Sequence, residues 1–181
     1  MKKKYVLIAV LLLSFVITNS SIVLAEQSRS TVPPMLKNLQ GKDELVSFLN
    51  EAKRIRSNIS TININTVNAK DNATEIQKQI NFYLTEISGL EKSLSDFDKK
   101  YANSQPDLLF SEQIEALLNS YKMSLNQQLS LLNALVNNEF DASKLFYSEY
   151  LTYIYYYLNL GDQMIAYINT FYNATIFTKY F

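Results

Sequence analysis

The sequence contains no cysteine, no histidine and no tryptophan, and only three glycines and three prolines in 181 residues. Without cysteine the chain has no disulfide, no thiolate nucleophile and no cysteine-ligated metal site. Without histidine it lacks the usual general base at neutral pH and the commonest metal ligand. Its three glycines form no phosphate-binding loop. We therefore expect a protein that is not an enzyme and that holds no cofactor and no metal.

Neither positive nor negative charge is in excess, because 17 Lys and Arg residues balance 17 Asp and Glu residues. Nucleic-acid binding draws on an excess of positive charge, so we expect no nucleic-acid partner. Aromatic side chains are abundant instead, with thirteen tyrosines and ten phenylalanines. The length of the chain is typical of a single domain with a short additional segment.

The first 25 residues have the pattern of a signal peptide. Lysines occupy positions 2–4, and an apolar run follows over residues 5–17. Small side chains before the bond between Ala25 and Glu26 fit a signal-peptidase site there. The apolar run is shorter than the ~20 residues of a spanning helix, although an uncleaved N-terminal anchor is the alternative. We expect a secreted, extracellular or cell-surface protein.

Two further regions are expected after residues 1–25. Residues 26–42 are a flexible lead-in, since they are mostly polar and contain Pro33 and Pro34. Residues 43–181 form the helical bundle domain, because apolar residues recur there at helical spacing.

The first apolar stripe of this domain begins near Asp43, whose side chain is a suitable helix N-cap. Apolar residues then recur every three or four positions from Leu45 to Ile62, as they do on one face of a helix. The end of the stripe, residues 60–67, is β-branched and alternates in polarity. We favour a helix that frays at this point, and a short strand is the alternative.

Two longer stripes follow, over about residues 72–102 and 104–136. Asn72, with a glutamate three residues later, resembles a capping box at the start of a helix. Ser104 is a suitable N-cap for the next helix, and a proline near its first turn is well tolerated there. The sequence therefore predicts two helices joined by a short turn.

The last stripe opens near Asn138 or Asp141 and extends toward the C-terminus. Gly161 is a point at which this helix can break, since glycine is unfavourable inside helices. Helices joined by short turns pack antiparallel. The predicted fold class is all-α, an antiparallel (up-down-up-down) four-helix bundle. A longer antiparallel coiled coil that completes its core by dimerising is the alternative.

The C-terminal region is unusually rich in tyrosine, with nine of the thirteen between Tyr147 and Phe181. Tyrosine is enriched in protein interfaces, and it also suits the boundary between lipid and water. A helix buried between its neighbours, with hydroxyl groups at the rim, is the structural alternative. Five residues form the candidate interaction surface: Tyr153, Tyr155, Tyr156, Tyr167 and Tyr172.

We therefore predict a secreted or cell-surface helical bundle that acts by non-covalent binding to a protein partner or by self-association. The alternative is a membrane-active or lipid-binding protein that acts through the aromatic C-terminal helix. The uncharged run Gln163–Thr178 has 16 residues, which is too short to span a bilayer but leaves contact with a membrane surface open.

Overall fold

The computed structural model describes residues 39–60, 62–138 and 142–177, and among these it describes no side chains for residues 142, 143, 147 and 171–177. All described residues belong to one compact unit, residues 35–181. The predicted signal peptide and most of the predicted lead-in lie outside the described residues.

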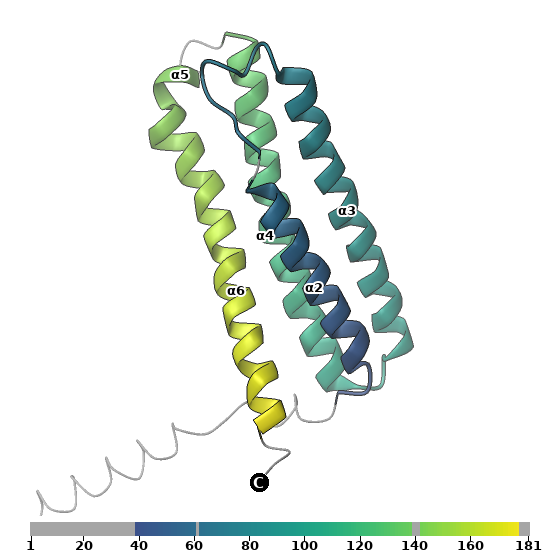
Figure 1. The fold of residues 1–181 in the computed structure, drawn as a ribbon. Coiled ribbons are helices and arrows are strands. Elements are labelled where there is room, and N and C mark those ends of the chain that lie inside the picture. Colours follow the sequence, from purple (N-terminus) through teal and green to yellow (C-terminus); the bar gives the residue numbers. More distant parts are fainter. Residues whose placement is uncertain (1–38, 61, 139–141, 178–181) are drawn as a thin grey trace, which may run out of the picture. The chain divides into compact units, whose positions relative to one another are not determined.

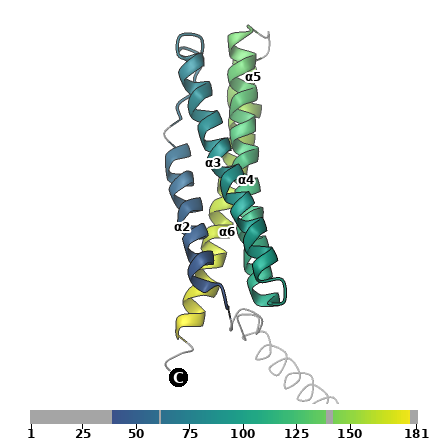
Figure 2. The same cartoon turned by 90° about the vertical axis from the view of Figure 1, so that its right-hand side faces the viewer.

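The described residues fold into helices connected by turns and irregular segments (Figure 1). In chain order these elements are α2 (Lys42–Ile59), α3 (Ala73–Lys100), α4 (Gln105–Val136), α5 (Ala142–Leu145), the π-helix η2 (Phe146–Tyr150) and α6 (Leu151–Phe177). The four long helices alternate in direction, as Figures 1 and 2 show. The predicted all-α four-helix bundle is therefore confirmed.

Helix α4 is the centre of the bundle, because it packs against α2, α3 and α6. Ile114, Leu117, Leu118 and Leu125 of α4 are fully buried. Removing such a side chain from water stabilises a fold by about 1.5–3 kcal/mol. Helix α3 lies at the edge and buries a single stripe of five residues: Ile76, Ile80, Ile87, Leu94 and Phe97. Much of the core therefore depends on α4.

The start of α2 is held by a carboxylate from another helix. The N-cap position is Gly41, and Asp43 lies in the first turn, so the predicted cap is wrong by two residues. The buried side chain of Asp107 in α4 accepts hydrogen bonds from the backbone N–H groups of Gln40 (2.9 Å) and Gly41 (2.8 Å). Asp107 thus supplies from a distance the acceptor that a local cap would supply.

The starts of α3 and α4 agree with the predictions in position. Asn72 and Ser104 are the N-cap residues, but neither side chain makes a capping hydrogen bond. The hydroxyl of Ser104 donates to the carboxylate of Asp107 instead. The buried carboxylate of Asp107 therefore accepts hydrogen bonds both from the start of α2 and from the N-cap residue of α4.

Two other predictions need correction. Helix α2 ends at Ile59, and residues 62–65 have no regular structure, so neither a frayed helix nor a strand forms there. Helix α6 continues through Gly161 without a break. A Cβ atom at Gly161 would lie 2.3 Å from the ring of Tyr121. Glycine at this position therefore allows α6 to pack closely on α4. The departure from α-helical geometry lies before α6, in the π-helix η2.

Candidate functional site

One face of α6 carries exposed aromatic side chains. Tyr153, Tyr156 and Tyr167 are exposed at 49%, 59% and 52%, and Leu160 between them is exposed at 38%. Steps of three, four and seven residues return to the same side of a helix, so these four side chains share one face. We call Tyr153, Tyr156 and Tyr167 the tyrosine stripe. The structure thus groups three of the five candidate residues.

The other two candidates do not join this group. Tyr155 is exposed at 57%, but it lines a cavity on a different side of α6. Consecutive helical residues point about 100° apart, which separates Tyr155 from Tyr156. The side chain of Tyr172 lies outside the described residues.

The tyrosine stripe faces outward because the opposite side of α6 is occupied by the core. Ile154, Leu158, Gly161 and Ile168 are buried. Their steps of four, three and seven residues define a second face of the same helix. Helix α6 therefore has a packed face and an exposed aromatic face.

Small polar side chains of α4 bring the two helices together. The hydroxyl of Ser120 donates to the carbonyl of Tyr157 (2.6 Å), and the hydroxyl of Ser124 donates to the carbonyl of Ile154 (3.1 Å). Both serines are buried, so these hydrogen bonds also satisfy their hydroxyl groups. These serines are not among the predicted site residues, although their four-residue spacing inside an apolar stripe is a signal for a contact between helices.

A shallow apolar groove adjoins the tyrosine stripe. Its volume is about 350 Å³, and it is lined by Gln113 of α4 and by Leu160, Met164 and Tyr167 of α6, among others. The Oε1 atom of Gln113 is buried and has no hydrogen-bond partner. The groove extends the apolar surface from the stripe toward α4.

Charged and polar groups connect α6 to α2 on another side. The guanidinium of Arg56 donates to both carboxylate oxygens of Asp162, at 2.8 and 2.7 Å. This hydrogen-bonded carboxylate raises the pKa of Arg56. The hydroxyl of Tyr121 also donates to Asp162 at 3.1 Å, and burial raises the pKa of Tyr121, with a further contribution from that carboxylate. The ammonium of Lys53 donates to Oδ1 of Asn169 at 2.8 Å.

We also searched the described residues for a metal site and for a helix that could span a membrane. Among them, no group of three or more acidic side chains is placed to hold a metal ion. Likewise, no helix within the described part of the chain is long and apolar enough to cross a membrane. Comparisons with protein-family models, with curated proteins and with solved structures found no match to this chain.

Proposed function

We propose that this chain is a secreted or cell-surface protein without catalytic activity, which binds a protein partner through the tyrosine stripe. The observation that carries the proposal is the grouping of three exposed tyrosines and Leu160 on one face of α6. Tyrosine side chains bury a large area at low entropic cost, and they are frequent among the residues that dominate binding energy. The secreted location rests on the pattern of residues 1–25.

The charge of α6 favours a protein over an anionic membrane as the partner. Between Leu151 and Thr170 the only charged residue is Asp162, and it is negative. Helices that lie on anionic membranes usually carry lysine and arginine beside their apolar face. In addition, the apolar residues on the packed face of α6 are already buried against the bundle, so they are not exposed to lipid.

The proposal is tested by comparing binding with and without the tyrosine stripe. The chain from residue 26 onward would be immobilised as wild type and as the triple variant Tyr153→Ser, Tyr156→Ser and Tyr167→Ser. Phe82→Ser on α3 is the matched control, because Phe82 is exposed at 57% on a different helix. We expect proteins from the surface of the expressing cells to bind wild type and control equally. The triple variant should bind them at least about tenfold more weakly.

Equal binding by the triple variant and the wild type contradicts the role of the tyrosine stripe. Flotation of the same three proteins with neutral and anionic vesicles separates the lipid-binding alternative. If wild type floats, the triple variant does not, and no protein depends on the stripe for capture, then the stripe binds lipid and our proposal is wrong.

A further inference from the structure

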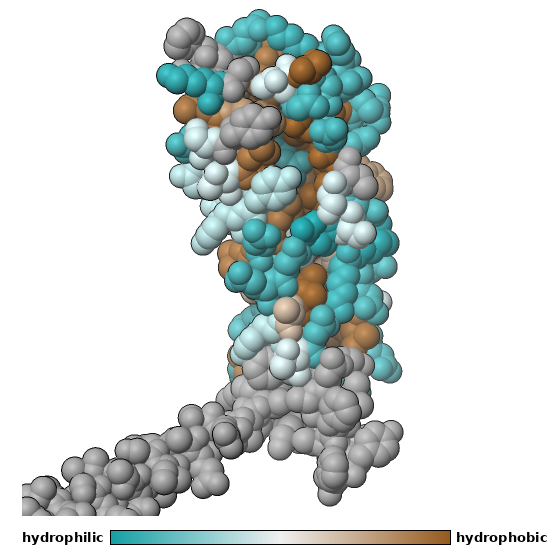
Figure 3. Space-filling view, turned by 60° about the vertical axis from the view of Figure 1, so that its left-hand side comes forward, coloured by the Kyte–Doolittle hydropathy of each residue, from teal (hydrophilic) through white to brown (hydrophobic). Residues whose placement is uncertain are grey.

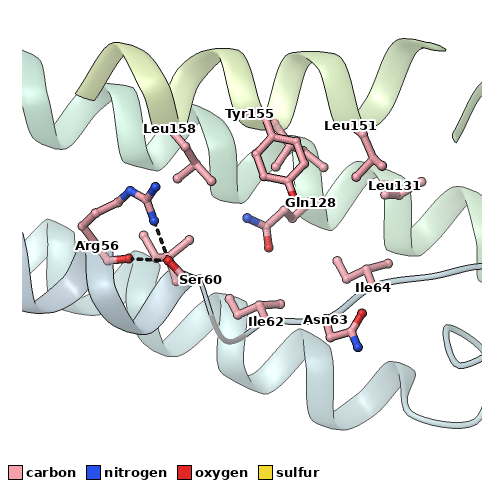
Figure 4. A pocket seen from close by; sticks show the side chains of 12 residues that line it. Arg56, Ser60, Ile62, Asn63, Ile64, Gln128, Leu131, Leu151, Tyr155 and Leu158 are labelled. Carbon is pink, nitrogen blue, oxygen red and sulfur yellow. Dashed lines mark hydrogen bonds between the residues drawn. The ribbon is translucent and has the colours of Figure 1, made fainter. Parts of the chain in front are cut away.

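The cavity that Tyr155 lines has a volume of about 230 Å³ and is separate from the groove beside the tyrosine stripe. It lies between α6, α4 and the segment that follows α2 (Figure 4). Figure 3 shows hydrophobic side chains along the middle of the face that includes α6, between side chains of intermediate and hydrophilic character. The cavity lining is mixed: its polar residues include Arg56, Ser60, Asn63 and Gln128, and its aliphatic residues include Ile59, Ile62, Ile64, Leu131, Leu151 and Leu158. The exposed Tyr155 also lines the cavity, which gives this tyrosine a setting different from that of the tyrosine stripe.

One polar group in this cavity has no protein partner. Gln128 of α4 is only 5% exposed, and its Oε1 atom is buried without a hydrogen bond. Figure 4 shows the amide of Gln128 extending into the space between Tyr155 and Ile62. An unpaired buried acceptor destabilises a fold, so its presence beside an open space points to a hydrogen-bond donor from outside the chain.

Arg56 is the charged residue in the cavity lining, and its guanidinium is already paired. Arg56 donates to both oxygens of Asp162 and to the hydroxyl of Ser60. The hydroxyl of Ser60 in turn donates to the carbonyl of Arg56. This end of the cavity therefore does not supply an uncompensated positive charge for an acidic ligand. The ligand that fits is uncharged, with an apolar body and one donor.

We propose that the cavity binds a small uncharged amphiphile, whose hydroxyl donates to Oε1 of Gln128 and whose hydrocarbon lies against Ile62 and Leu158. A dry apolar cavity of about 150 Å³ in another protein holds benzene, so a volume of about 230 Å³ suits a somewhat larger molecule. This inference is independent of the tyrosine stripe.

The test compares two probes of the same size. 1-Octanol has a hydroxyl donor, and heptyl methyl ether has the same heavy atoms but no donor. Titration calorimetry with the chain from residue 26 onward should show one saturable site for 1-octanol. The ether should bind roughly three- to tenfold more weakly, because it cannot donate to Gln128.

Three variants assign this binding to the cavity. Gln128→Leu keeps the volume of the side chain but removes the acceptor, so the preference for 1-octanol over the ether should disappear. Leu151→Phe fills part of the cavity and should weaken both probes. Gln113→Leu is the matched control, because Gln113 is also on α4 and has an unpaired buried Oε1 atom in the other groove. It should leave both affinities unchanged.

Several results overturn the proposal. The first is a wild type that does not saturate with 1-octanol up to its solubility limit, as expected of a cavity filled only by water. The second is equal binding of the two probes, and the third is a preference for 1-octanol that survives in Gln128→Leu. A readout that needs no variant is the nuclear Overhauser effect between bound 1-octanol and the methyl groups of Ile62 and Leu158. Its presence supports the site, and its absence under saturating conditions contradicts it.

Discussion

Helix α6 is held differently on its two inner sides. Toward α4 the contact is close: Ser120 and Ser124 bond to its backbone, and Gly161 meets the ring of Tyr121. Toward α2 the contact consists of polar bridges, such as the bidentate pair of Arg56 and Asp162. A cavity of about 230 Å³ remains on this second side.

The difference shows how side-chain size sets the spacing of helices. Glycine and serine allow two backbones to approach, so the contact between α4 and α6 leaves little room for change. Long charged side chains instead hold helices apart and leave space between them. Tyr121 belongs to both sides, because its ring is buried against Gly161 and its hydroxyl donates to Asp162. The close side fixes the position of α6, and the open side provides room for a ligand.

The largest effect is expected where the close contact is broken. Gly161→Ala places a Cβ atom 2.3 Å from the buried ring of Tyr121. We expect the free energy of unfolding to fall by about 2 kcal/mol, because overpacking exceeds the gain of at most about 1 kcal/mol in helix propensity. Urea denaturation measures this change. An increase in stability would show that α4 and α6 are not in close contact at this point.

The next effect concerns Tyr121, which links the two sides. Its raised pKa means that the hydroxyl ionises in the unfolded chain, near pH 10, before it ionises in the folded protein. Its contribution to stability is therefore complete below about pH 10 and declines above it, by up to about 1.4 kcal/mol per pH unit. Urea denaturation between about pH 9 and 11 should give a shallower decline for Tyr121→Phe than for wild type. Equal slopes would contradict the buried setting of this hydroxyl.

A smaller effect is expected for the polar bridge. A double-mutant cycle with Arg56→Met and Asp162→Asn should give a coupling energy of about 1 kcal/mol, since the pair is bidentate but partly exposed. The coupling should decrease at high salt, because solvent-accessible charges are screened. A coupling of zero at low salt would mean that the bridge does not hold α6 to α2.

The smallest effect is a gain in stability away from both sides. Gly89 lies in α3, and a Cβ atom there would meet nothing within 4 Å. Gly89→Ala should raise the free energy of unfolding by about 0.5–1 kcal/mol through helix propensity alone. Together with Gly161→Ala, it forms a pair of identical substitutions with opposite expected signs. Thermal and urea unfolding of both variants would test that contrast.

The long helices could be predicted from the sequence because their apolar residues follow helical spacing without interruption. The prediction over residues 72–102 corresponds to Ala73–Lys100, and that over 104–136 corresponds to Gln105–Val136. The spacing alone does not show how much of an apolar stripe is buried by neighbouring helices. Leu90 is part of the regular stripe of α3 but is only half-buried, because α3 packs at the edge of the bundle.

Features that depend on partners far apart in the sequence could not be predicted. Asp107 is 66 residues from Gly41, whose N–H group it binds. Gly161 favours a break when local propensity alone is considered, whereas the ring of Tyr121 in α4, which a Cβ atom would meet, explains why glycine occupies this position inside a continuous helix. Tyrosine content alone predicts the candidate residues, and it does not separate Tyr155 from the tyrosines that face another side of α6.

The central claim is that α6 remains packed on α4 while its tyrosine stripe binds the protein partner. Amide hydrogen exchange of residues 151–168, with and without anionic vesicles, tests this claim most directly. We predict that the amides of α6 are protected as strongly as those of α4, and that vesicles leave this protection unchanged. Loss of protection confined to α6 in the presence of vesicles would contradict the claim, because the helix would then leave the bundle to bind lipid.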